Sequence, residues 1–267
     1  MSLYKGLVLF TLPMYYAFHT RYQGMTGVFA WLVKYFLPCF FVAFASDTFS
    51  WSLFALGLIY VYQFYELGYI QNDCETIKRE TAPTMRLTPD ELMSYERHKC
   101  LFLLVRIIET AVVGVCLYVM GLKLSLLLFF ALTLPVFVLY NTVRNGFCLV
   151  IHLVLMMMRY TAPVFISANS LSLWPAVFLF FAYPVTLFVE RSVKGKFGYK
   201  STLLARFVLP SYEGRYLFRI KYYSVFVILL LIATFTGVAS VLYVIPVAGL
   251  LMSSVMTYRN VNLQYNK

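Results

Sequence analysis

The chain has 267 residues, of which 61% are hydrophobic and 12% charged, and its mean hydropathy is +0.77. Soluble domains usually carry about 25% charged residues, and a soluble fold cannot hide this much apolar surface. The composition therefore excludes a soluble globular protein and indicates a membrane protein. The net charge of +11 must then be distributed over the surfaces of the membrane.

A helix needs about 20 apolar residues to cross a hydrocarbon core of about 30 Å. Eight segments meet this requirement and are predicted to be transmembrane helices: residues 30–47, 50–70, 99–120, 122–140, 146–166, 172–189, 216–238 and 240–258. Residues 3–18 form a further apolar segment that is short for a span, so we expect it either to cross or to lie in the interface. Since only helices and closed barrels span lipid, the sequence predicts an all-α polytopic bundle of eight to nine transmembrane helices.

Basic residues gather in alternate connections between these segments. They follow the second, fourth and sixth segments: Lys78, Arg79, Arg86, Arg97 and Lys99, then Arg144, then Arg191, Lys194, Lys196, Lys200, Arg206, Arg215, Arg219 and Lys221. An even number of crossings separates these three connections, so they lie on one face of the membrane. By the positive-inside rule this face is predicted to be cytoplasmic.

Charged residues inside the predicted spans indicate working sites, because a charge at the centre of a membrane helix costs at least about 2.5 kcal/mol. One stripe of the second span follows i, i+4, i+7 and i+11 spacing and leads to the acidic end of that span: Tyr62, Glu66, Tyr69 and Asp73. Glu66 and Tyr69 are expected to line the cavity of the site. Arg106 and Glu109 are three residues apart and are expected to form a structural pair. Arg159 has no local partner, so it is expected to find one across the bundle or to reach the interface.

Three acids lie at the end of the second span, among the basic residues: Asp73, Glu75 and Glu80. One interpretation is solvated loop charge. The other is a site for a phosphorylated substrate, in which the acids hold Mg²⁺ and the bases bind the remaining phosphate oxygens. The sequence contains neither GxxxxGK[ST] nor GxGxxG, so it does not support a nucleotide cradle of either type.

The stretch YIQNDCETIKRETAPTMR, residues 69–86, resembles the first acidic motif, NDxxDxxxD, of the UbiA superfamily of intramembrane prenyltransferases. The branch that contains decaprenyl-phosphate phosphoribosyltransferase is the most similar. Its further elements are matched by Pro83, Thr84 and Arg86 after the motif, Tyr140 and Arg144 in a YxxxK-like element, MRYTAPV with Arg159, LSLW before the sixth span, Arg191 after it, and ARFVLPSYEGRYL with Arg206, Leu209, Tyr212, Tyr216 and Leu217. The resemblance covers roughly residues 30–258.

The chain departs from this pattern in three places. Thr76 stands where the family has its second Asp, with Glu75 one place earlier, and the third acid is Glu80. The usual second DxxxD motif is replaced by ERSVKGKFGYK, residues 190–200. The ninth span of the family has no counterpart after residue 258, and residues 3–18 are a candidate for that place in the bundle.

The resemblance implies a polyprenyl-phosphate phosphoribosyltransferase of cell-envelope glycan synthesis, in the bacterial inner membrane with its site facing the cytoplasm. Such an enzyme moves phosphoribose from phosphoribosyl diphosphate to a polyprenyl phosphate and releases diphosphate. Residues 1–267 then form a single UbiA-like domain whose cytoplasmic active-site loops are residues 66–99 and 190–221.

The same resemblance implies roles for particular residues. Asp73, Glu75 and Glu80 are expected to be the catalytic acids and the ligands of Mg²⁺. Substrate binding is expected from Asn72, Lys78, Arg79, Arg86, Tyr140, Arg144, Arg159, Arg191, Lys194, Lys200 and Tyr212. The expected partners are the bilayer, the lipid phosphate and the sugar donor, without nucleic acid.

Two alternatives stay open. The first is a UbiA-type enzyme that moves a prenyl group from a prenyl diphosphate to an aromatic or other small acceptor, although the missing second acidic motif counts against it. The second is a non-catalytic membrane relative that has lost its chemistry together with the intact motif.

Overall fold

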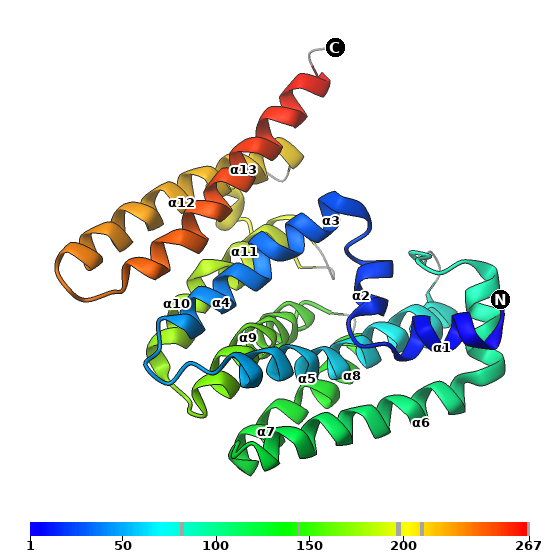
Figure 1. The fold of residues 1–267 in the computed structure, drawn as a ribbon. Coiled ribbons are helices and arrows are strands. Elements are labelled where there is room, and N and C mark those ends of the chain that lie inside the picture. Colours follow the sequence, from blue (N-terminus) through cyan, green and yellow to red (C-terminus); the bar gives the residue numbers. More distant parts are fainter. Residues whose placement is uncertain (81–82, 144, 196–198, 209–210, 266–267) are drawn as a thin grey trace.

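The computed structural model describes residues 1–80, 83–143, 145–195, 199–208 and 211–265. Every regular element in these ranges is a helix (Figure 1), which confirms the predicted all-α class. Within the same ranges, seven helices are long and apolar enough to cross a membrane: Gly24–Phe44, Trp51–Arg79, Pro89–Val119, Leu124–Thr142, Cys148–Ala168, Glu213–Phe235 and Val241–Asn260. The fold is therefore that of a polytopic membrane protein.

Several of these spans are composed of more than one helix. The first combines α3 (Gly24–Trp31), a π-helical turn (Leu32–Phe36) and α4 (Leu37–Phe44), and the fourth combines α7 (Leu124–Ala131) with α8 (Thr133–Thr142). The remaining long helices are α5 (Trp51–Ile70), α6 (Pro89–Val119), α9 (Cys148–Ala168), α12 (Tyr212–Phe235) and α13 (Val244–Tyr265). The predicted segment 172–189 falls on α10 (Leu173–Ala182) and α11 (Pro184–Val193), which are bent by 42° and make an eighth span if the pair counts as one.

The apolar segment at residues 3–18 is broken into two short helices, α1 (Leu3–Thr11) and α2 (Tyr15–Thr20). Pro13 and Met14 separate them, and Met14 has a left-handed backbone with φ 67°. Nine residues of α-helix rise only about 14 Å, so α1 does not reach across a bilayer. The interfacial alternative for this segment stays a prediction.

The third span begins earlier than its apolar run predicts, at Pro89 rather than residue 99. A capping box starts the helix in polar sequence: Thr88 Oγ1 accepts a hydrogen bond from Glu91 N, and Glu91 Oε2 accepts one from Thr88 N. Pro89 at the first helical position fits, because its missing N–H is not needed there. Hydropathy marks where a helix enters lipid, and this helix begins outside that region.

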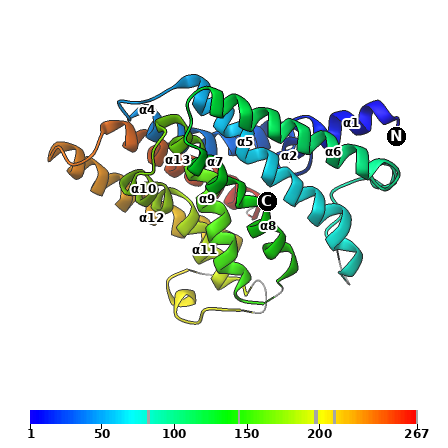
Figure 2. The ribbon, with the colours of Figure 1, turned by 90° about the horizontal axis from the view of Figure 1, so that it is seen from below.

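Helices α5 and α9 form the buried centre of the bundle, with α8 packed on both. Two glycines of α5 permit this close packing, because a Cβ at Gly57 would lie 3.1 Å from Ile166 and one at Gly68 would lie 2.3 Å from Phe137. The helices α12 and α13 form a hairpin beside α4 (Figure 1). The carboxyl ends of α5, α8 and α11 lie at one end of the bundle (Figure 2).

Candidate anion-binding site

A cavity of about 410 Å³ opens between the ends of α5, α8, α9 and α11. Four arginines of the described chain line it, and each comes from a different segment: Arg21 after α2, Arg86 before α6, Arg159 in α9 and Arg191 in α11. His152 and Arg159 both line the cavity and are seven residues apart in α9, so the cavity is about 10 Å deep along this helix.

Arg159 is 5% exposed, and tyrosines surround its guanidinium. Its Nη2 donates hydrogen bonds to the hydroxyls of Tyr22, at 2.9 Å, and Tyr62. The guanidinium carbon lies 4.3 Å from the ring centre of Tyr35 and 5.3 Å from that of Tyr65. Among the residues that the structure describes, no carboxylate pairs with Arg159, and its Nε has no hydrogen-bond partner. Its charge is therefore available to a ligand in the cavity.

Arg191 supplies a second available donor. It lies in the last turn of α11, and its Nη1 is buried without a hydrogen-bond partner in the described structure. A buried N–H without a partner is costly, and a guanidinium fork suits the paired oxygens of a phosphate. Arg191 and Arg159 thus face the same cavity with unused donors.

Asp73 is the hub that orients the other two arginines. It lies in a π-helical turn (Gln71–Glu75) and is 2% exposed; such turns often occur at functional sites. Its Oδ1 accepts hydrogen bonds from Arg21 at 2.9 Å, from Arg86 at 3.0 Å and from Asn72 at 3.0 Å. Its Oδ2 accepts one from the Tyr16 hydroxyl at 3.1 Å. One carboxylate thereby holds two guanidiniums at the cavity wall.

Asp73 changes the pKa values of two residues that precede the first span, Arg21 and Tyr16. Burial lowers the pKa of Arg21, but the hydrogen bond to Asp73 and the charge of this carboxylate outweigh burial and raise that pKa above its ordinary value. Burial, and then the charge of Asp73, raises the pKa of Tyr16. Arg21 therefore stays charged, and Tyr16 keeps the proton that it donates.

The three acids of the sequence motif lie in different surroundings. Glu80 lines the cavity. Glu75 does not line the cavity but lines two other recesses, one of which shares Glu80 and Asn141 with the cavity. Glu75 also forms ion pairs with Lys78 at 2.8 Å and Lys99 at 3.8 Å.

This arrangement decides how the acids fit a metal ion. Within the described residues, no group of three His, Cys, Asp or Glu side chains is placed to hold one. Both oxygens of Asp73 already bind arginines, and Glu75 lies outside the main cavity. The acids as they stand do not fit a Mg²⁺ site with three carboxylates, so magnesium stays a prediction.

The structure separates the predicted substrate-binding residues into groups. Five of them line the main cavity: Asn72, Arg86, Tyr140, Arg159 and Arg191. Glu80, which was predicted as a catalytic acid and metal ligand, lines it as well. Lys78 and Arg79 line the adjoining recess of about 320 Å³, which shares Glu80 and Asn141 with the cavity. Lys194 and Lys200 are exposed and do not line it in the described structure. Arg144 and the Tyr212 side chain lie outside the described part of the chain.

Several cavity residues were missed by sequence reasoning, among them Arg21, Asn141 and His152. His152 carried a signal, because it shares a helical stripe with Leu155, Met156 and Arg159 at i, i+3, i+4 and i+7 spacing. Asn141 adjoins the predicted Tyr140 and donates to Gly68 O and Gln71 Oε1. Arg21 gave no periodic signal, because it lies between α2 and α3 and belongs to neither helix.

The predicted stripe on α5 is partly wrong. Tyr69 lines the cavity, but Glu66 turns away from it and is fully buried against α6, where Arg106 Nη2 lies 2.8 Å from its Oε2. The expected local pair of Arg106 with Glu109 is a longer contact of 4.0 Å. The dominant partner of Arg106 is therefore across the bundle, on the neighbouring helix.

Comparison with protein-family models, with curated proteins and with solved structures finds no match for this chain. The relationship to the UbiA superfamily accordingly remains a resemblance of motifs.

Proposed function

We propose that the cavity binds the phosphate groups of its substrates and that the protein is a polyprenyl-phosphate phosphoribosyltransferase. The observation that carries the proposal is Arg159, a buried arginine without a carboxylate partner in the described structure, in a cavity that three further arginines line. A buried charge in a membrane helix is costly unless it is paired. An anionic ligand supplies the missing partner.

The charge of the site fits a polyanion better than a neutral ligand. Four arginines meet two carboxylates, Asp73 behind the wall and Glu80 in it, so positive charge is in excess among the described residues. Guanidinium groups bind phosphate oxygens in pairs and with defined geometry. A diphosphate offers enough oxygens to contact several of these groups at once.

In the proposed reaction, negative charge develops on the diphosphate as it leaves the ribose. The bond between C1 of the ribose and the diphosphate oxygen breaks, and its electron pair leaves with the diphosphate. An oxygen of the lipid phosphate forms the new bond to C1 as the sugar passes through an oxocarbenium-like state. Because that oxygen is ionised at neutral pH, no general base is needed. The arginines stabilise the negative charge that develops on the leaving group.

Positioning accounts for the rest of the proposed catalysis. Arg159 and Arg191, which lie on different helices, are suited to hold different phosphate groups. Tyr140 and Asn141 line the α8 side of the cavity, and Asn141 Oδ1 is buried there without a hydrogen-bond partner in the described structure. This oxygen is an acceptor for a hydroxyl group of the sugar.

A product assay tests this proposal. The purified chain is incubated with Mg²⁺, phosphoribosyl diphosphate and a polyprenyl phosphate, and the lipid extract is examined by mass spectrometry. We expect a lipid whose mass has increased by one phosphoribosyl group, and its loss in Arg159→Gln. Turnover of a prenyl diphosphate with a small acceptor instead would favour the prenyltransferase. A protein that turns over neither donor and binds neither would favour a non-catalytic relative.

A further inference from the structure

The turn between α1 and α2 places backbone polar groups inside the protein. The turn includes Pro13 and the left-handed Met14, so the helical hydrogen bonds are interrupted there. Phe10 before it and Tyr16 after it are fully buried. Buried backbone groups need partners, and here two charged side chains provide them.

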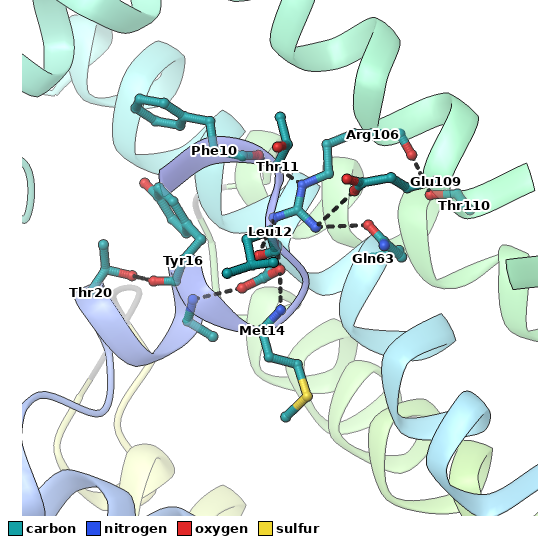
Figure 3. Close-up of polar contacts among 12 residues, drawn as sticks. Phe10, Thr11, Leu12, Met14, Tyr16, Thr20, Gln63, Arg106, Glu109 and Thr110 are labelled. Atoms are coloured by element: carbon teal, nitrogen blue, oxygen red, sulfur yellow. Dashed lines mark hydrogen bonds and ion pairs between the residues drawn. The ribbon is translucent and has the colours of Figure 1, made fainter. Parts of the chain in front are cut away.

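Arg106 binds the first half of this turn (Figure 3). Its side chain is fully buried, and its Nε donates to Phe10 O at 2.8 Å while Nη2 donates to Leu12 O at 3.4 Å. Nη1 donates to Gln63 Oε1 at 2.7 Å, and Nη2 also donates to Glu66 at 2.8 Å. The guanidinium thus connects α6, α5 and the amino-terminal segment.

Glu66 binds the second half of the turn. Its Oε2 accepts a hydrogen bond from Met14 N at 2.9 Å, and its Oε1 accepts one from Ala17 N at 2.7 Å. The carboxylate therefore fixes the first turn of α2 against α5. Together, Glu66 and Arg106 hold residues 10–17 at four backbone atoms.

The fixed segment leads directly to the candidate site. Tyr16 precedes Ala17 and donates to Asp73, and Arg21 N donates to Ala17 O at 2.8 Å. The Arg21 guanidinium then lies at Asp73 and 4.5 Å from the ring centre of Tyr69, on the cavity wall. Arg21 thus directly follows α2, and Glu66 is hydrogen-bonded to the backbone at the start of α2.

We propose that Glu66 and Arg106 are positioning residues that hold Arg21 in place as an anion-binding residue of the cavity. This inference rests on the proposed function, because it needs a phosphate ligand in the cavity. A buried ion pair by itself is a poor source of stability compared with apolar packing. Its four contacts with the backbone of residues 10–17 give this pair a task that apolar side chains cannot perform.

Binding of inorganic pyrophosphate to the purified full-length chain, without divalent metal, tests the inference. Three single variants, Glu66→Gln, Arg106→Lys and Arg21→Gln, are each expected to weaken the affinity about tenfold, the usual scale for hydrogen bonds to charged groups. The double variant Glu66→Gln with Arg21→Gln is expected to bind no more weakly than Arg21→Gln alone. Such non-additivity would show that Glu66 acts through Arg21.

Glu109→Gln is the matched control. It removes a carboxylate 4.0 Å from the same guanidinium, and in the described structure Glu109 makes no hydrogen bond to residues 10–17. Its pyrophosphate affinity should equal that of the wild type. If Glu66→Gln does not fold, Arg106→Lys, which keeps the charge opposite Glu66, is combined with Arg21→Gln in the same cycle.

The outcomes separate this inference from the proposed function. Wild-type protein that does not bind pyrophosphate overturns the proposed function, and the inference with it. If the wild type binds and the loss of affinity in the double variant equals the product of the two single losses, the inference alone is overturned. Glu66 would then act independently of Arg21. The inference alone is also overturned if the wild type binds pyrophosphate and neither Glu66→Gln nor Arg106→Lys lowers the affinity.

Discussion

The guanidinium of Arg159 lies 4.3 Å from the ring centre of Tyr35, and Tyr35 in turn donates its hydroxyl proton to the backbone oxygen of Arg159 at 3.1 Å. This reciprocal contact fixes a charged side chain between α9 and the π-helical turn Leu32–Phe36 of the first span without neutralising it. Aromatic faces and hydroxyls stabilise a guanidinium by a few kcal/mol at most, and they leave its charge in place. The cavity therefore has a positive end inside the bundle.

Arg191 and Lys194, two basic residues near the end of α11, should contribute unequally to pyrophosphate binding. Arg191 lines the cavity, whereas Lys194, three residues later, is exposed away from it. We expect Arg191→Gln to weaken pyrophosphate binding by about tenfold to a hundredfold, the range for hydrogen bonds to charged groups, and Lys194→Gln to leave it unchanged. Titration calorimetry on both variants checks this, and equal losses would place the phosphate at the general basic surface.

Substitutions of Asp73 and Glu75 should affect donor binding to different extents, although both residues belong to the acidic motif. Asp73→Asn removes the charge that holds Arg21 and Arg86, so we expect weaker binding of phosphoribosyl diphosphate both with and without Mg²⁺. Glu75→Gln breaks only exposed ion pairs with Lys78 and Lys99, which contribute little free energy. We expect this variant to bind phosphoribosyl diphosphate like the wild type.

Binding at several Mg²⁺ concentrations distinguishes these roles. A loss in Asp73→Asn that appears only when Mg²⁺ is present would show that Asp73 is a metal ligand. Unaltered donor binding and unaltered Mg²⁺ dependence in this variant would show that Asp73 serves neither purpose.

The contact of Gly68 with Phe137 makes α5 sensitive to a single methyl group. A Cβ at Gly68 would lie 2.3 Å from the Phe137 ring, which must then move, and Phe137 lines the cavity. We expect Gly68→Ala to lower the free energy of unfolding by about 1–3 kcal/mol. Gly114→Ala is the control, because its Cβ would meet Tyr60 at an ordinary 3.6 Å and alanine favours a helix by up to about 1 kcal/mol. Thermal unfolding in detergent should move in opposite directions for the two variants.

The bent pair of α10 and α11 should cross the membrane as one span. Arg191 at the end of α11 lines the same cavity as His152 near the start of α9, so the chain must return to the end from which α9 began. We expect an epitope inserted after Ser170 and one inserted after Lys200 to be accessible from opposite sides of sealed vesicles. Antibody binding to both epitopes from one side would make the pair a re-entrant segment.

Hydropathy predicted the long helices well, because each had to supply its own backbone hydrogen bonds in lipid. It predicted their ends less well. The start of α6 at Pro89 depends on the capping by Thr88 and Glu91 in polar sequence. Three arginines that the sequence resemblance singled out, Arg86, Arg159 and Arg191, line one cavity.

The contribution of residues 3–21 could not be read from the sequence. Their apolar character resembles a span, but Pro13 and Met14 divide them, and the resulting turn depends on Arg106 and Glu66 from other helices. Contacts between side chains and a distant backbone have no sequence periodicity. For the same reason Glu66 was assigned to the cavity stripe, when it faces α6.

Binding of phosphoribosyl diphosphate to the purified full-length protein and to Arg159→Gln, measured side by side by titration calorimetry, tests the central claim most directly. The wild type should bind the donor, and the variant should bind it at least about tenfold more weakly while its thermal unfolding shows that it is folded. Equal affinity of the two proteins, or no binding by the folded wild type, would contradict the assignment of the arginine cavity as the phosphate site.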